Sequence, residues 1–284
     1  MLLLTVIACT TDELSESWQI DRLRVLAVAA EPAEPRPGDT VTFSSLVVSP
    51  GVDVAATVWF ACLFGDDEYG CEVDPSLLGS LEDTTKLDED TLDALYDAGF
   101  IGAEPYLPPV WQVPTDALAD LSEDERQEGL TALINVTAIP DQDEITEDDL
   151  ELAFKRVPVS EAKTPNHNPV IANVTVDAFE VAEGSTVSVD RGLPYTLGVT
   201  LTDDSVEPYT YVTEDGVAED REEEPYFTWY AEHGSFEQTS SLWPYTTVTW
   251  YPPTDRTVDA GSLWVVVRDR RGGMAWSRVD VAYR

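Results

Sequence analysis

The chain has 284 residues, 43% of them hydrophobic, with eight tryptophans, which excludes global disorder and predicts two domains of ordinary size. Its 55 acidic and 16 basic residues give a formal net charge of −39. This charge argues against nucleic-acid binding through clustered Lys and Arg, and against adhesion to anionic lipid by charge alone. Two interpretations of the acid excess remain open: a solvated surface suited to salty surroundings, or a source of ligands for divalent cations.

The apolar run of residues 2–8 is too short to span a bilayer, which takes about 20 residues, and it ends at Cys9. Residues 6–9 read VIAC and resemble the lipobox of bacterial lipoproteins. The resemblance implies a signal peptide of residues 1–8, cleavage after Ala8, and an acylated Cys9 that opens a tether of residues 9–19. Several acyl chains, at about 0.8 kcal/mol per buried methylene, hold a protein on a membrane durably. Because Thr10 follows the cysteine, the analogy favours the outer membrane.

One feature departs from the lipobox pattern, since no Lys or Arg precedes the apolar run. A truncated start, or a Met1 that is internal to a longer signal, would each account for this departure. A buried N-terminal strand is the structural alternative to a signal peptide.

Residues 20–162 show strand patterns punctuated by Pro and Gly. Alternation over 22–28, a proline-rich turn over 31–39 and strands over 40–48 and 56–63 predict an Ig-like sandwich with Trp59 in its core. Cys62 and Cys71 enclose a polar loop. In an exported chain we expect a disulfide between them, which stabilises by about 3 kcal/mol.

The stretch near residues 88–129 is acidic and differs from the rest of this half. Leu92, Leu95 and Tyr96 have helical spacing, and Ser122 with Glu125 forms a capping-box pattern. These signals predict a mostly helical insertion. Such an insertion either carries specificity or is a surface cap.

Residues 163–169 contain two prolines among Asn-rich turn residues and predict a short, stiff linker. Strand patterns resume over 170–284, and a turn over 269–273 precedes the closing strand. The spacing predicts a second, seven-stranded Ig-like sandwich. The fold class is therefore all-β, with two tandem Ig-like sandwiches, the first carrying the insertion.

Five groups of residues form a recognisable set: RVLAV at 24–28 with Glu31-Pro32, Trp59 ahead of the two cysteines, KRVPV at 155–159, NHNP at 166–169, and VRDRRGG at 267–273. With them, the chain after Cys9 resembles myxobacterial-type predicted lipoproteins that have paired Ig-like or PKD-like domains. The resemblance implies an architecture and a location at the cell envelope, but no reaction.

Catalytic signatures are missing from the sequence, which contains two histidines and no zinc-protease, nucleophile-elbow or phosphate-loop motif. Calcium is the one cofactor that the sequence suggests. Six acidic residues of the second half are predicted to lie in loops at one end of the sandwich, where oxygen ligands could surround Ca²⁺: Asp203, Asp204, Asp215, Glu219, Asp220 and Asp269. The alternative is a set of solvated acidic loops.

A second candidate site is the tripeptide Trp243-Pro244-Tyr245, which breaks the strand alternation and is expected at an exposed loop tip that contacts a partner. Together these features predict an envelope lipoprotein, not an enzyme, anchored to the bacterial outer membrane on its periplasmic or surface face. It would bind an envelope or surface protein, or form a structural element of an envelope assembly. The alternative is an exported enzyme, or enzyme subunit, with residues 88–129 as a substrate lid.

Overall fold

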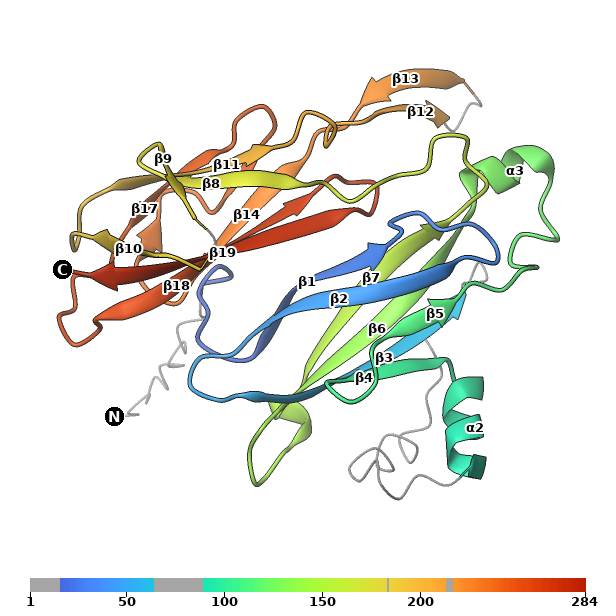
Figure 1. Cartoon of the computed structure of the whole chain (residues 1–284), viewed down its shortest axis with the longest axis horizontal. Helices are drawn as coiled ribbons and strands as arrows, with labels where there is room; N and C mark the ends of the chain where they lie inside the picture. The colour runs from blue at the N-terminus through green and yellow to red at the C-terminus, as the bar shows by residue number, and fades with distance from the viewer. Residues whose placement is uncertain (1–15, 64–88, 183, 213–216) are drawn as a thin grey trace, which may run out of the picture.

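The computed structural model describes residues 16–63, 89–182, 184–212 and 217–284. These residues form two Ig-like β-sandwiches that lie side by side, with their long strands running along the contact between them (Figure 1). The predicted all-β class is confirmed.

The first sandwich pairs a three-stranded sheet with a four-stranded sheet, and all neighbouring strands are antiparallel. The three-stranded sheet consists, in spatial order, of β1 (Arg24–Glu31), β2 (Thr40–Val48) and β5 (Val110–Gln112). The four-stranded sheet consists of β4 (Phe100–Glu104), β3 (Val54–Leu63), β6 (Leu130–Pro140) and β7 (Glu151–Val159). Trp59 is fully buried between the sheets, with its ring 5.9 Å from that of Phe43, so its predicted core position is confirmed.

Residues 88–129 are less helical than the sequence predicts. The helix α2 (Glu89–Asp97) packs Leu95 on the outer face of the four-stranded sheet, and α3 (Glu123–Glu128) opens with the predicted capping box. Between the two helices, β4 pairs with β3 and β5 pairs with β2, so that each adds a strand to one sheet. The prolines of this stretch cannot continue a helix, which favours this extended course. The segment is therefore part of the sandwich and not an appended insertion.

A short 3₁₀ helix, η2 (Glu147–Asp149), precedes β7. Within the described ranges, no helix is long and apolar enough to cross a membrane.

The second sandwich has two five-stranded sheets. The first consists of β10 (Thr186–Val189), β19 (Met274–Tyr283), β18 (Ala260–Arg268), β14 (Tyr226–Ala231) and β16 (Ser240–Leu242). The second consists of β15 (Ser235–Phe236), β17 (Thr247–Tyr251), β11 (Tyr195–Leu201), β8 (Ile171–Val176) and β9 (Phe179–Val181). Only β10 and β19 pair in parallel among these strands, and the hairpin of β12 (Pro208–Val212) and β13 (Ala218–Glu222) forms a separate ribbon. Phe227, Trp229 and Trp250 fill the core.

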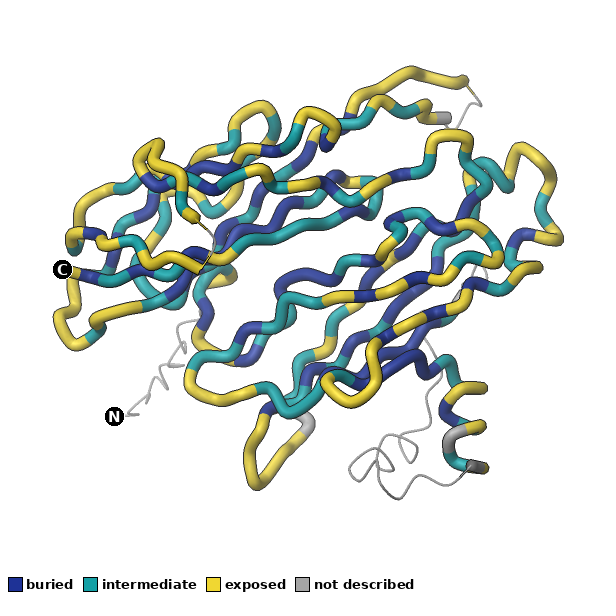
Figure 2. The backbone as a smooth tube through the Cα atoms, in the orientation of Figure 1, coloured by how far each residue is buried: buried dark blue, intermediate teal, exposed yellow. Residues whose placement is uncertain are grey.

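The first sandwich covers the outer face of β18, which is why this strand is buried along most of its length (Figure 2). Leu263, Val265 and Val267 face the core of the second sandwich, whereas Trp264 and Val266 face the first sandwich. We call the second group of contacts the apolar seam. Its buried members are Ile20, Leu26, Ala27, Val48, Trp264 and Val266.

Residues 18–20 run beside the second sandwich before the chain enters the first, and we call them the strap. The Ala231 N–H at the end of β14 donates to the Trp18 carbonyl at 3.1 Å, and the Ile20 N–H donates to the Ala231 carbonyl at 2.9 Å. The Trp18 ring packs edge-on against Phe236, with centroids 5.3 Å apart. Trp18 and Gln19, the last residues of the expected tether, are thus bound to the second sandwich.

Candidate functional site

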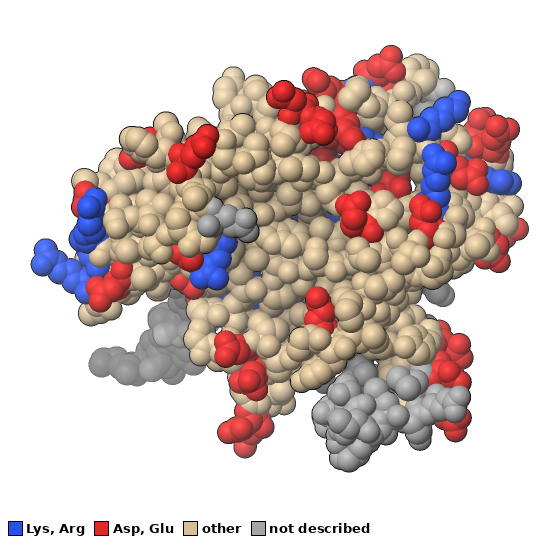
Figure 3. Space-filling model, viewed as in Figure 1, with Lys and Arg blue, Asp and Glu red and all other residues tan. Residues whose placement is uncertain are grey.

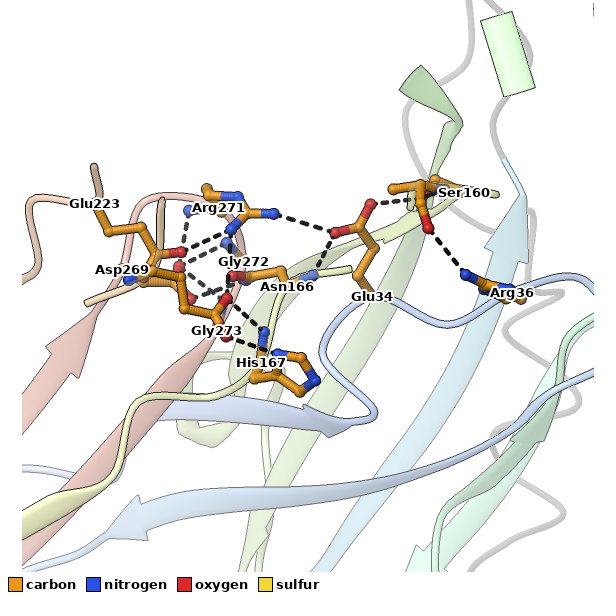
Figure 4. Close-up of polar contacts among 12 residues, drawn as sticks. Glu34, Arg36, Ser160, Asn166, His167, Glu223, Asp269, Arg271, Gly272 and Gly273 are labelled. Atoms are coloured by element: carbon orange, nitrogen blue, oxygen red, sulfur yellow. Dashed lines mark hydrogen bonds and ion pairs between the residues drawn. The ribbon is translucent and has the colours of Figure 1, made fainter. Parts of the chain in front are cut away.

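A turn of residues 269–273 joins β18 to β19 and extends to the first sandwich (Figure 4). Asp269 shapes this turn, because its Oδ1 accepts hydrogen bonds from the backbone N–H groups of Arg271, Gly272 and Gly273 at 2.7 to 2.9 Å. Gly272 has a φ of +122°, which favours glycine. The short carboxylate of Asp269 and the glycine at 272 thus favour this turn, in which Arg270 also adopts a positive φ of +73°.

Arg271 lies at the centre of the contacts between the sandwiches. Its guanidinium nitrogens lie 3.0 Å from a Glu223 oxygen, 3.4 Å from a Glu207 oxygen and 3.5 Å from a Glu34 oxygen. The guanidinium carbon also lies 4.8 Å from the centroid of the Tyr209 ring. Because Glu34 belongs to the first sandwich, this single side chain connects the two sandwiches.

The linker is clamped between the same partners. The Asn166 N–H donates to Glu34 Oε2 at 2.6 Å, and its Nδ2 donates to Asp269 Oδ2 at 2.8 Å. Asn168 Nδ2 donates to the Ala30 carbonyl at 2.7 Å, while its Oδ1 accepts from the Met274 N–H at 2.9 Å. Each asparagine thus contacts both sandwiches and fixes the angle between them.

Lys155 adds a direct contact from β7, where its buried Nζ donates to the Gly272 carbonyl. We call the whole group the polar junction. Its members are Glu34, Lys155, Asn166, His167, Asn168, Glu207, Glu223 and the turn 269–273.

Acidic groups outnumber basic ones in the polar junction, where Glu34, Glu207, Glu223 and Asp269 face Lys155 and Arg271, while Arg270 of the turn pairs with Glu224 outside it. Burial raises the pKa of Glu223 to about 7, and it also raises the pKa of Asp269, although hydrogen bonds from Asn166 and the turn oppose that shift. Burial lowers the pKa of Lys155 to about 8. The junction can therefore exchange protons near neutral pH.

A pocket of about 370 Å³ opens on the outer face of the second sandwich, next to the edge strand β16. Its lining residues are Tyr226, Ser240, Ser241, Leu242 and Arg270. Arg270 lies within 6.0 Å of the Tyr226 ring centroid and 3.5 Å from Glu224. None of the lining residues comes from the segment 88–129, where an enzyme lid was the alternative expectation.

The predicted contact tripeptide follows β16 directly. Tyr245 is 77% exposed and Pro244 is exposed, as the sequence predicts for a loop tip. Trp243 differs, because it is partly buried against the core of the second sandwich. Its partner-binding role stays a prediction.

The predicted calcium ligands differ in their surroundings, since some are exposed and one is buried. Asp203 and Asp204 are exposed in a turn after β11, and Glu219 and Asp220 are exposed on β13, where Arg221 lies 2.7 Å from Glu219. Asp269 is buried, and both of its carboxylate oxygens accept hydrogen bonds within the junction.

Asp215, the sixth predicted calcium ligand, lies outside the described residues. Across the part of the chain that the structure describes, no three His, Cys, Asp or Glu side chains are grouped to hold a metal ion. Calcium binding stays a prediction.

Both cysteine predictions depend on residues outside the described ranges. Cys9, the predicted acylation site, precedes them, and so does the predicted signal peptide. Cys62 lies near the end of β3, but Cys71 is not among the described residues. Acylation and the disulfide stay predictions.

The sequence did not identify the polar junction as a site, although it held a usable signal. The stretches 155–159, 166–169 and 267–273, together with Glu31-Pro32, are marks of resemblance in the sequence. It also predicts a linker over 163–169, a turn over 269–273 and a calcium ligand in Asp269, but it does not bring them together. In the structure they meet at this junction, since Lys155, Asn166, Asn168 and Asp269 are joined by hydrogen bonds within it.

The surface around these sites is acidic over both sandwiches, and basic side chains are fewer on the face shown in Figure 3. This agrees with the net charge of −39. The basic side chains of the turn 269–273 therefore lie on an otherwise acidic molecule.

Comparison with models of protein families gives no match, and comparison with curated proteins gives none. Among solved structures, the chain is similar to murine CEACAM1b, with 10% identity and a TM-score of 0.21 over 93% of this chain and 99% of that one. It is also similar to three N-terminal domains of the highly immunogenic outer capsid protein (Hoc) of bacteriophage RB49, with 10% identity and a TM-score of 0.23 over 93% of this chain and 70% of that one. At TM-scores this low, nothing about function transfers to this chain.

Proposed function

We propose that the protein is an outer-membrane lipoprotein that serves as a rigid binding module, in which the two sandwiches act as one body. The burial of β18 on both of its faces carries this proposal, because separating the sandwiches would expose Trp264 and Val266 to water. The polar junction and the clamped linker support the same fixed arrangement. A rigid pair holds a binding surface in a defined orientation.

The proposed binding surface is the edge of the second sandwich formed by β16, the pocket and Tyr245. Exposed tyrosine beside a pocket lined by Leu242 and Arg270 has the composition of protein interfaces, which are enriched in Tyr and Arg. The proposed partner is an envelope or surface protein. No observation favours the enzyme alternative, and we do not propose it.

Photo-crosslinking tests the binding surface. A photoreactive residue at Tyr245, introduced in the native cells, is expected to give a discrete adduct with one envelope protein. The same residue at Phe179, which is 78% exposed on the opposite sheet, is the matched control and should give none. Identical adduct patterns from the two positions would contradict the proposed surface.

Acyl-probe labelling tests the anchor separately. Wild type should take up the probe and fractionate with the outer membrane, whereas Cys9→Ser should lose the label and become soluble. A wild-type protein that is unlabelled and soluble would refute the anchor. The binding surface would then still be tested independently by the crosslinking experiment.

A further inference from the structure

Glu223 is an enclosed carboxyl group of the polar junction, with a side chain that is only 1% exposed. Its Oε1 accepts from Arg271, and its Oε2 accepts from the Glu207 N–H at 3.1 Å. These two donors, one cationic and one neutral, are few for a buried carboxylate, since each of its oxygens can accept about two hydrogen bonds. Ionised Glu223 is therefore incompletely stabilised where it lies.

The charges that face Glu223 come from every element around it. The turn 269–273 contributes Arg271 and Asp269, the segment before β12 contributes Glu207, and the first sandwich contributes Glu34 through Arg271. His167 of the linker lies 2.7 Å from Glu207, and Lys155 faces Asp269. Arg270 of the turn pairs with Glu224 outside the junction. Among the remaining Asp, Glu, Lys and Arg side chains, four carboxylates outnumber two cations by two when all are ionised, and protonation of one carboxyl halves that excess.

We propose that the polar junction is a pH-responsive latch between the two sandwiches, which closes when Glu223 binds a proton and loosens when Glu223 ionises. Protonated Glu223 still accepts from the Glu207 N–H, and it frees Arg271 to bind Glu34 and Glu207 more closely. Ionised Glu223 competes with those two carboxylates for one guanidinium. The contact between sandwiches through Glu34 is the one that weakens.

The direction of the pH effect follows from the burial of Glu223. Its pKa is raised to about 7 in the folded protein from an ordinary value of 4.5. Because the pKa of Glu223 is raised on folding, its contribution to the stability of the closed junction is fully present below about pH 4.5. This contribution is lost as the pH rises through about 7. Mild acid should close the latch, and mild alkali should loosen it.

Thermal unfolding of the full chain at about pH 5.5 and about pH 8, at matched ionic strength, tests the latch. The melting temperature of wild type should fall over this interval by about 5 °C more than that of Glu223→Gln, which mimics the protonated acid. At about pH 8, Glu223→Gln should be the more stable protein. An ordinary stabilising ion pair predicts the opposite sign, because the substitution would then remove a favourable charge.

The nearby Glu222→Gln is the matched control, because Glu222 is exposed and its substitution removes the same charge from the surface. It should behave as wild type. In parallel, hydrogen exchange should show that protection of the Asn166 amide, which binds Glu34, falls roughly tenfold more in wild type than in Glu223→Gln as the pH rises. Equal pH dependence of the two glutamine variants would overturn the latch.

If Glu223→Gln does not fold, carboxyl-carbon NMR of wild type decides the question. A Glu223 titration midpoint near 7, accompanied by shifts at Asn166, would support the latch. A midpoint near 4.5 would overturn it.

Discussion

The apolar seam and the polar junction join the same two sandwiches through different kinds of contact, apolar packing in one and hydrogen bonds and ion pairs in the other. The seam buries Leu26 and Val48 against Trp264, and such contacts are strong but tolerate sliding and rotation. The junction uses directional bonds through Asn166, Asn168 and Arg271, in which small displacements break contacts. The difference indicates that the seam supplies most of the free energy that holds the sandwiches together, whereas the junction sets their angle and makes it sensitive to protons.

Trp264→Ala should have the largest effect, because it removes the largest buried side chain of the seam. We expect the free energy of unfolding to fall by about 3 to 5 kcal/mol in urea denaturation. Trp59→Ala in the first core is the matched control, with a similar loss. Only Trp264→Ala should also deprotect the Ile20 amide before global unfolding, and equal deprotection in both would show that the seam has no separate role.

Asp269→Ala should come next, since it leaves three backbone N–H groups of the turn without their acceptor. The expected loss in the free energy of unfolding is about 2 to 3 kcal/mol. Asp269→Asn should cost less than Asp269→Ala, because the amide oxygen still accepts those bonds. The exposed Asp203→Ala should change the value by less than about 0.5 kcal/mol, and an equal loss there would remove the special role of the turn.

Lys155→Met should have the smallest effect and the opposite sign. Burial lowers the pKa of Lys155 from its ordinary value of 10.5 to about 8. The stability that its neutral form contributes is therefore present above about pH 10.5 and is lost as the pH falls through about 8. At about pH 7 the charged form is disfavoured by burial, and an apolar side chain of similar length should raise the free energy of unfolding by up to about 1 kcal/mol.

The exposed Lys163→Met is the control for Lys155→Met and should be neutral. A loss above about 2 kcal/mol for Lys155→Met would mean that its bond to Gly272 outweighs the desolvation of the ammonium group.

The sandwiches could be predicted from the sequence because alternation and turn chemistry act locally. Trp59, the strand over 40–48 and the capping box at Ser122 all follow from neighbours a few residues away. The short strands β4 and β5 were missed, because three to five residues carry little periodicity and their pairing with β3 and β2 depends on distant partners.

The polar junction could not be assembled from the sequence for a related reason. Lys155 and Gly272 are 117 positions apart, and Asn166 and Asp269 are 103 apart, so no local pattern connects them. Asp269 was assigned to a calcium site from its position at a strand end alone. Its burial and its bonds to the turn depend on how the sandwiches lie against each other, which alternation within each sandwich does not determine.

The strap has a mechanical consequence. A pull applied to the chain before residue 18, as a membrane anchor at Cys9 would apply, first loads the two hydrogen bonds between the strap and Ala231 and the Trp18 ring on Phe236. Because the strap lies parallel to β14, these bonds are strained along the strand together and do not open one by one. Part of the force therefore enters the second sandwich, and part reaches β1 through the Arg24 guanidinium, which donates to the Ser17 carbonyl at 2.6 Å. The strap thus divides a load transmitted by the anchor between β14 and the apolar seam, of which Ile20 is a member.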